Sequence, residues 1–290
     1  MVAISRKGII AIFAFRRHAY LRLILEQIAL SNYGRELEVR VYLDSLPGAR
    51  GAWDSRVLRE LEAFKELNLI TVKREYNFGL RGNILHGLDD CSEHADFFIC
   101  LEDDTVVSPE GIDSMVRLYE SDLGARDNIG AVCATSFSTK TENNSWVTTD
   151  RFISWGWATS SRAWQMFRGE SSKPSQHDLI SRIPATFSWP EKFFVTRMYR
   201  KIDNLDSWAI EFTHWNRLKG NTILRPLGNF LQLGLSGPST HAKWGPKLPP
   251  ARSSEAAPTV LDPLDGSKKL YSWLRVYKLL IGYLASLSRF

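Results

Sequence analysis

The stretch Phe97-Phe-Ile-Cys-Leu-Glu-Asp-Asp104 decides the fold, because five consecutive apolar residues are followed directly by three acids. A short, wholly apolar run is typical of a strand that is buried on both faces of a parallel sheet. Three adjacent carboxylates cannot continue such a strand, because buried charges without partners are strongly disfavoured. The acids are therefore predicted to lie at the carboxyl edge of the sheet, where open α/β sheets bind their ligands.

The residues on either side of this stretch alternate between strand and helix patterns. Asp54 and Ser108 are predicted to cap helices, and Pro109 suits the first turn of the second of these. The expected strands are 9–15, 39–43, 69–73 and 97–101. The expected helices are about 19–30, 54–67, one that follows a turn over 77–83 and ends at about 88, and one that starts at 108–110. This rhythm predicts an α/β fold with a Rossmann-like, mostly parallel sheet flanked by helices.

The chain changes character after about residue 135. Eight of the ten Trp lie between Trp146 and Trp244, and six of the twelve Pro lie between Pro238 and Pro263. We therefore expect four segments: a ligand-binding half over 1–135, a second half of the same domain over 136–243, a Pro-rich linker over 244–267 and a tail helix over 268–290.

The tail, residues 268–290, is basic and amphipathic. It holds five basic residues and no acid, so the remainder of a chain whose total formal charge is +5 is formally neutral. Apolar residues recur at helical spacing and include Trp273 and Tyr277, which suits binding to an anionic membrane surface. A helix docked on the protein's own core, or a homodimer contact, fits the same pattern. No apolar run is long enough to predict a membrane-spanning helix.

Cysteine and charge content limit the remaining classes. Cys91, Cys100 and Cys133 form no CxxC pair, so neither a disulfide framework nor structural zinc is supported, and buried, reduced thiols are expected. The protein is accordingly predicted to be cytoplasmic, at the inner face of the membrane if the tail binds there. The small basic excess and the lack of a nucleic-acid-binding motif argue against a nucleic-acid partner.

Glu102-Asp103-Asp104 is the candidate metal motif. Mg²⁺ and Mn²⁺ prefer oxygen ligands and bridge to phosphates, which would use carboxylates at a strand end. A solvated acidic turn is the alternative. Asp44, at the end of the second strand, suits a ligand contact or a turn, and Arg17 and Arg81 suit a phosphate contact or a solvated surface.

Taken in order, these features resemble a GT-A fold, nucleotide-sugar-dependent glycosyltransferase. The resemblance covers about residues 8–243, and its most specific part, the Trp-Gly-Trp stretch, is similar to bacterial, family 2-like enzymes. The acidic triplet is similar to that of N-acetylglucosaminyltransferase I-like enzymes. The matching segments are Ala14-Phe-Arg-Arg17, Asp44, Asn77-Phe-Gly79 with Arg81 and Asn83, Glu102-Asp-Asp104, Phe152-Ile-Ser-Trp-Gly-Trp-Ala-Thr159 with Arg162-Ala-Trp164, Asp206-Ser-Trp208, Arg225-Pro-Leu-Gly-Asn229 and Thr240-His241.

The resemblance implies an inverting enzyme that moves a sugar from a nucleotide-diphosphate sugar, with a UDP-sugar favoured, to a hydroxyl of a glycan or glycolipid. Bacterial surface polysaccharide or lipopolysaccharide synthesis is the implied setting. Asp104 and His241 would hold Mn²⁺ or Mg²⁺, although His241 also suits an ordinary surface position. Asp206 would be the base that deprotonates the acceptor, with Asp203 and Glu211 as competing acids and a helix cap as its alternative role.

The implied binding residues come from both halves of the chain. Trp rings can pack on the C–H faces of sugars, although core packing is the alternative for each ring. The acceptor residues would be Trp208 and Glu211, and the donor residues would be Phe15, Arg17, Asp44, Asn77, Gly79, Arg81, Glu102, Asp103, Trp155, Gly156 and Trp157.

Two other functions are weighed against this one. A sugar-nucleotide nucleotidyltransferase would require a Gly-rich phosphate loop after the first strand, and Ala14-Phe-Arg-Arg17 contains no Gly. A non-catalytic, Trp-rich carbohydrate-binding protein would not require three acids at a strand end.

Overall fold

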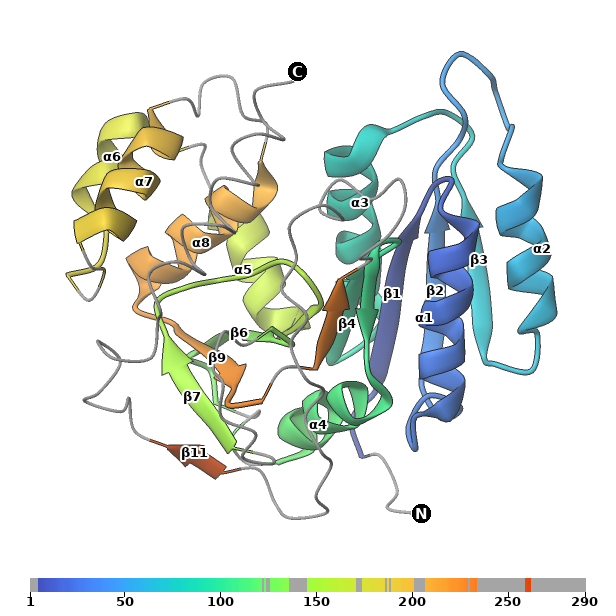
Figure 1. The fold of residues 1–290 in the computed structure, drawn as a ribbon, viewed down its shortest axis with the longest axis horizontal. Helices are drawn as coiled ribbons and strands as arrows, with labels where there is room; N and C mark the ends of the chain where they lie inside the picture. The colour runs from blue at the N-terminus through green and yellow to red at the C-terminus, as the bar shows by residue number, and fades with distance from the viewer. Residues whose placement is uncertain are drawn as a thin grey trace.

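A nine-stranded sheet forms the centre of the molecule in the computed structural model (Figure 1). The structure describes residues 5–121, 123, 126–135, 145–170, 174–185, 187, 189–200, 207–228, 230–233 and 259–261. The sheet order is β11-β7-β9-β6-β8-β4-β1-β2-β3, and β10 and β5 form a separate pair. The strands are β1 Gly8–Ala14, β2 Glu38–Leu43, β3 Leu69–Lys73, β4 Phe97–Glu102, β5 Thr105–Val107, β6 Ile129–Cys133, β7 Ser145–Thr149, β8 Trp157–Ser160, β9 Thr222–Pro226, β10 Leu231–Leu233 and β11 Thr259–Leu261.

The first four strands are parallel, as the alternating pattern predicts, and the later strands make the sheet mixed. β1 pairs in parallel with β2 and with β4, and β2 pairs in parallel with β3. β8 runs antiparallel between β4 and β6. Because β8 comes from beyond residue 135 and lies inside the sheet, the two halves expected from the sequence share one sheet.

Eight helices are present in the described part of the chain. They are α1 His18–Leu30, α2 Ser55–Ala63, α3 Gly79–His94, α4 Pro109–Glu120, α5 Ser161–Glu170, α6 Gln176–Ser181, α7 Trp189–Tyr199 and α8 Trp208–Lys219. The two predicted caps are confirmed. Asp54 accepts the backbone N–H of Arg56 at 2.9 Å, and Ser108 Oγ accepts that of Gly111 at 3.2 Å.

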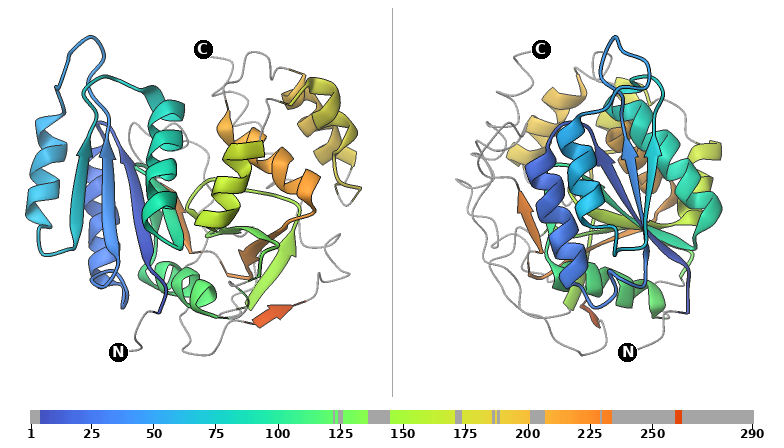
Figure 2. Two further views of the ribbon diagram at one scale, coloured as in Figure 1. Left: turned by 180° about the vertical axis from the view of Figure 1, so that it is seen from behind. Right: turned by 90° about the vertical axis from the view of Figure 1, so that its right-hand side faces the viewer.

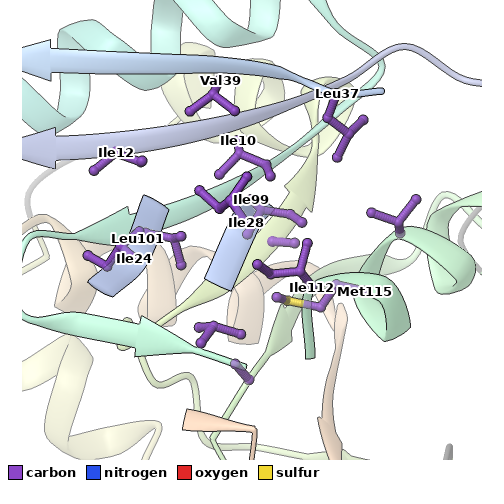
Figure 3. Packing of buried hydrophobic residues seen from close by; sticks show 14 of the residues in the cluster. Ile10, Ile12, Ile24, Ile28, Leu37, Val39, Ile99, Leu101, Ile112 and Met115 are labelled. Carbon is purple, nitrogen blue, oxygen red and sulfur yellow. The ribbon is translucent and has the colours of Figure 1, made fainter. Parts of the chain in front are cut away.

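Two apolar clusters cover the two faces of the sheet, because successive strand residues point to opposite sides. On β1, Ile10 and Ile12 pack with residues of α1, α2 and α4, and Figure 3 shows Ile10, Ile24 and Ile112 within this cluster. Ile9 and Phe13 pack instead with residues of α3, α5 and α8. α1 and α3 accordingly lie on opposite sides of the strands (Figure 2).

This layering positions a ligand crevice. The chain runs from β1 through α1 to β2 and β3 on one side of β1, and then crosses over through α3 to β4 on its other side. In open α/β sheets, ligands bind at such a switch point, beyond the carboxyl ends of the strands. The crevice of this protein is therefore expected beyond β1 and β4.

The remaining predictions concern the thiols and the tail. Cys91, Cys100 and Cys133 are buried and free, which confirms the expectation. In the described ranges, no helix has the length and apolar character needed to cross a membrane. The predicted tail helix, 268–290, lies outside the described residues.

Candidate functional site

A cleft of about 880 Å³ opens at the carboxyl ends of β1, β2 and β4. This volume is within the range of small-molecule sites. The structure brings seven of the predicted donor residues together in its lining: Phe15, Arg17, Asp44, Asn77, Gly79, Glu102 and Asp103. These residues come from four separate segments, one at the end of each of the parallel strands β1, β2, β3 and β4. All four strands end at the same edge of the sheet.

Asp103 ties the end of β4 to the turn after β1. Its Oδ2 accepts the backbone N–H of Phe15 at 3.0 Å, and its Oδ1 lies 2.6 Å from Arg17 Nη1. Its own N–H donates to the carbonyl oxygen of Phe13 at 3.0 Å. Both carboxylate oxygens are thus engaged by protein groups, and Asp103 holds Phe15 and Arg17 in place at the cleft.

Of the two acids that follow β4, Asp104 makes the weaker contacts with other protein groups. The residue is buried, with 4% of its surface exposed. Arg17 Nη1 lies 3.4 Å from its Oδ2, and Thr105 Oγ1 lies 3.4 Å from its Oδ1. Both distances are long for hydrogen bonds to a carboxylate, which are normally below 3 Å. The Asp104 carboxylate therefore retains capacity for a further ligand.

The three acids crowd one another. Burial raises the pKa of Glu102 to about 8, and the carboxylates of Asp104 and Asp103 add to the increase. Burial also raises the pKa of Asp103, against the opposing effect of Arg17. For Arg17, burial acts to lower the pKa, but the carboxylates of Asp103 and Asp104 outweigh it and the pKa is raised. Because a carboxyl group with a pKa of about 8 is mostly protonated at neutral pH, one guanidinium faces the carboxylates of Asp103 and Asp104, and this imbalance favours the approach of a cation.

No cluster of three or more His, Cys, Asp or Glu side chains is arranged to hold a metal ion within the part of the chain that the structure describes. Mg²⁺ is commonly bound by one or two carboxylates together with water and substrate phosphates, so a complete protein cage is not required. The Asp104 carboxylate fits this open kind of site: it does not itself line the cleft, but its neighbours Glu102 and Asp103 do. His241, the second predicted ligand, lies outside the described residues.

Asp44 fixes the start of α3 beside the cleft. Its Oδ1 accepts the backbone N–H of Ser45 at 3.0 Å and that of Phe78 at 2.8 Å. Asn77 Nδ2 donates to the carbonyl oxygen of Ser45 at 2.6 Å, which joins the same two loops. Gly79 has a φ of 67°, and this left-handed conformation starts the helix in the required direction.

Arg81 and Glu211 contact each other. Arg81 Nη2 lies 2.9 Å from Glu211 Oε1 and 2.7 Å from Oε2, and the side chains are 30% and 13% exposed. Neither residue lines the described cleft. The predicted donor residue and the predicted acceptor residue therefore form an ion pair that joins α3 to α8.

The Trp-Gly-Trp stretch belongs largely to the interior. Trp157 is fully buried, and its ring stacks on that of Trp208 with centroids 5.4 Å apart and an interplanar angle of 27°. Trp208 is itself only 5% exposed. The structure places both rings in the core and not in the cleft, since Phe152, Trp164 and Phe212 enclose them. Trp155 is half-buried and packs against the cluster on the other face.

Gly156 is required by packing. It has a φ of 64°, and a Cβ at this position would lie 2.6 Å from Val107 Cγ2. The close neighbour of this predicted donor residue is thus strand β5. The predicted base, Asp206, lies outside the described residues, directly before Ser207 at the start of α8.

The cleft is also lined by Arg16, His18, Tyr20 and Arg56, which were not predicted to bind a ligand, and by Asn83, which the resemblance included without a role. His18 and Tyr20 could have been found, because the first turn of a helix that follows a sheet strand borders the ligand crevice. Asn83 is marked only by the resemblance of its segment to the family's N-x-G stretch. Its Oδ1 accepts from Arg74 Nε at 2.9 Å, a contact that depends on the tertiary fold.

No protein-family model and no curated protein matches this chain. Many solved structures are similar to it in part, among them three glycosyltransferases. A mannosyltransferase from Pyrobaculum calidifontis, in complex with GDP-Man and Mn²⁺, is 14% identical, with 98% of this chain and 65% of that chain covered and a TM-score of 0.41. GalNAc-T7 with UDP, GalNAc and Mn²⁺ is 10% identical, with 76% and 42% covered and a TM-score of 0.46.

The third is the galactosyltransferase LgtC in complex with donor and acceptor sugar analogs. It is 13% identical, with 75% of this chain and 72% of that chain covered and a TM-score of 0.40. The chain spans less than two thirds of the length of the mannosyltransferase and of GalNAc-T7. Because all three identities are under 25% and all three TM-scores are under 0.5, we base the function proposed below on this chain's own residues.

Proposed function

We propose that the chain is a metal-dependent glycosyltransferase that takes a sugar from a nucleotide-diphosphate sugar. The observation that carries the proposal is the pair of acids after β4. Both carboxylate oxygens of Asp103 contact the turn after β1. Asp104 is buried next to Asp103 and makes only long contacts, at 3.4 Å. A structural acidic turn has no need for a second, poorly satisfied carboxylate, because burying a charge without close partners is costly.

The cleft suits the donor in size and in charge. Arg16 and Arg17 lie in its lining at the end of β1, where they can neutralise a diphosphate. Asp44 and Asn77 lie beyond β2 and β3, where they suit the ribose and base of the nucleotide, and a UDP-sugar is the favoured donor. Glu102 and Asp103 complete the lining on the side of β4.

A divalent cation, Mn²⁺ or Mg²⁺, is the proposed cofactor, held by Asp104 and by His241. When bound, it would stabilise the negative charge that develops on the departing nucleoside diphosphate. Asp103 serves the same site indirectly, since its bonds keep Arg17 and the backbone of Phe15 beside Asp104.

The proposed catalytic base is Asp206. An inverting transfer requires one carboxylate to accept the proton of the attacking hydroxyl. Glu211, the nearest described competitor on α8, is held in the ion pair with Arg81 at 2.7 Å, which occupies its carboxylate. The acceptor is proposed to be a glycan or a lipid-linked sugar of a bacterial surface polysaccharide, reached in part through binding of the tail to an anionic membrane.

Hydrolysis of a panel of UDP-, GDP-, CMP- and dTDP-sugars, with Mn²⁺, Mg²⁺ or EDTA, tests the proposal. We expect metal-dependent turnover of one class of donor, and a loss of about 100-fold or more in Asp104→Ala, since a group acting on developing charge is worth roughly that factor. Asp127→Ala, which removes an exposed carboxylate that does not line the cleft, is the matched control. A complete lack of metal-dependent turnover and of sugar-nucleotide binding would refute the function.

The base is tested separately with an acceptor. Asp206→Asn is expected to abolish transfer while the affinity for the nucleotide stays close to that of the wild type. Glu211→Gln, which keeps the shape of the other acid, is expected to retain more transfer than Asp206→Asn. The reverse order of the two variants would move the base to Glu211.

A further inference from the structure

Helix α7 carries two exposed aromatic rings that the proposed reaction does not use. Trp189 is 76% exposed and Phe193 is 59% exposed. Their rings stack on each other, with centroids 5.9 Å apart and an interplanar angle of 19°. Large aromatic side chains are seldom left together in water, and such a patch commonly marks an interaction surface.

The fold of the protein does not depend on these rings. The inner side of α7 contributes Val195 and Tyr199, which pack with Leu179 of α6 and Ile210 of α8. Trp189 and Phe193 are four residues apart, so they share a different stripe of the helix that faces solvent. The aromatic pair is therefore available to a partner.

The stripe is flanked by positive charge. At 100° per residue, Lys192, Arg197 and Arg200 fall within about 80° of the middle of the Trp189–Phe193 stripe. Within the described residues, no ion pair engages any of these three cations. No acid occurs at positions 189, 192, 193, 196, 197 or 200. A partner for this surface must combine an apolar zone with negative charge.

We propose that this face of α7 binds an anionic lipid bilayer, with the two rings at the interface and the cations among the headgroups. Interfacial helices combine Trp and Phe with flanking Lys and Arg in this way. Each basic residue near an anionic leaflet adds to the electrostatic attraction. The inference deepens the proposed function and rests on it in one respect, because a lipid-linked acceptor would be met at this surface.

The place of α7 in the molecule agrees with this role. In Figure 1, α6 and α7 lie toward the same end of the molecule as the carboxyl ends of β1 and β2, and both views of Figure 2 show the same relation. A bilayer in contact with α7 would thus adjoin the end of the molecule at which the cleft is built.

Charge also argues against the other occupants of this surface. The segment 268–290 carries five basic residues and no acid, so the cations beside Trp189 repel it. A second copy of the chain that presents the same face would bring the same cations together. An anionic bilayer satisfies both the rings and the charges.

Co-sedimentation of the full-length protein with vesicles tests the inference, with phosphatidylcholine alone compared with phosphatidylcholine containing 30% phosphatidylglycerol. Trp189→Ala combined with Phe193→Ala is expected to lower the partition coefficient on the anionic vesicles at least about tenfold, since burial of one such ring is worth 1.5 kcal/mol or more. Lys192→Gln combined with Arg197→Gln is expected to lower it on the anionic vesicles alone, and more so at low salt.

Two matched controls accompany these variants. Leu30→Ala removes a side chain that is 71% exposed on α1, and Arg126→Gln removes an exposed cation elsewhere. Both are expected to bind as the wild type does. Thermal unfolding checks that the α7 variants remain folded, which their exposure predicts.

Several outcomes would overturn the inference. One is a wild type that does not bind the anionic vesicles. Another is an α7 double variant that binds them normally while Trp273→Ala combined with Arg275→Gln does not, because the contact would then be the tail. A change of oligomeric state in the α7 variant, without a change in vesicle binding, would identify a second copy as the occupant. Sugar-nucleotide hydrolysis without vesicles reports on the proposed function alone, since none of these positions lines the cleft.

Discussion

The carboxylate of Asp103 accepts the backbone N–H of Phe15 at 3.0 Å, and this bond joins β4 to the turn after β1 across 88 residues of sequence. The same side chain pairs with Arg17 at 2.6 Å. Asp103 therefore determines where the end of β1 lies relative to Asp104. The neighbouring acids differ in their contacts: Asp103 bonds to the turn after β1, whereas Asp104 is contacted only at 3.4 Å, which suits the metal proposed for it.

Asp103→Ala is expected to lower the free energy of unfolding by about 2 kcal/mol, because a buried carboxylate loses charge-assisted hydrogen bonds. Urea denaturation measures this. Asp127→Ala breaks the exposed ion pair with Arg162 and is expected to cost roughly 0–1 kcal/mol. Equal losses in the two variants would contradict the structural role of Asp103.

Asp104→Asn, unlike Asp103→Ala, is expected not to lower the free energy of unfolding. Removing one of three crowded carboxylates lets the pKa of Glu102 fall from about 8 toward its ordinary range, so the protein without ligand keeps or gains stability. The rise in Tm that Mn²⁺ and UDP together confer on the wild type is expected to disappear. Thermal scans with and without both ligands provide the measurement, and an unchanged ligand-induced shift would show that Asp104 holds no metal.

A comparison of the free energies of unfolding of Gly156→Ala and Gly79→Ala distinguishes the cost of backbone strain from the cost of steric overlap. Both residues have a positive φ, 64° and 67°, but only at Gly156 would a Cβ meet a neighbour, Val107 at 2.6 Å. Gly79→Ala is expected to cost about 1–2 kcal/mol from the left-handed backbone alone. Gly156→Ala is expected to cost about 2–4 kcal/mol, since overpacking adds to the strain. Equal costs by urea denaturation would show that the Val107 contact is relieved easily.

A double-mutant cycle tests the link between α3 and α8. Arg81→Ala and Glu211→Ala should each destabilise the protein, with a coupling free energy of about 1 kcal/mol for a partly buried pair in contact. The four proteins are compared by denaturant unfolding. A coupling of zero would mean that the 2.7 Å contact contributes nothing to holding the two helices together.

The three thiols are expected to resist modification in the native protein. Burial raises the pKa of Cys91 and of Cys133 to about 12, and that of Cys100 well above its ordinary value. At pH 8, Ellman's reagent should react with all three thiols in guanidinium but only slowly with the folded protein. Because the folded-state pKa values lie above the unfolded value of about 8.5, the thiols contribute stability below that pH, and the contribution falls as the pH rises above it. A fast native reaction would contradict their burial.

Local pattern sufficed for the order of strands and helices in the first half of the fold, but α2 ends at Ala63 and not near Leu67, and α3 begins at Gly79, inside the predicted turn 77–83. The strand over 69–73 was predicted with its observed bounds, and β4 extends only to Glu102 beyond its apolar run. The end of α3 was not predictable, because the residues after Leu88 are mostly polar. The helix continues to His94 since tertiary partners satisfy them: Trp164 Nε1 donates to Asp89 at 2.8 Å, and the Tyr42 hydroxyl donates to Asp90 at 2.6 Å.

The sequence by itself determined that three acids follow a buried strand at the ligand edge of an α/β sheet, because apolar runs and charges cannot share a buried environment. It could not assign separate roles to Asp103 and Asp104, since that depends on Phe15 and Arg17, which reach one acid closely and the other only at 3.4 Å. It also could not assign Trp157 and Trp208 to the core and Trp189 to the surface. The same ring is favourable in either place, and only the packing of helices around it decides how much water it meets.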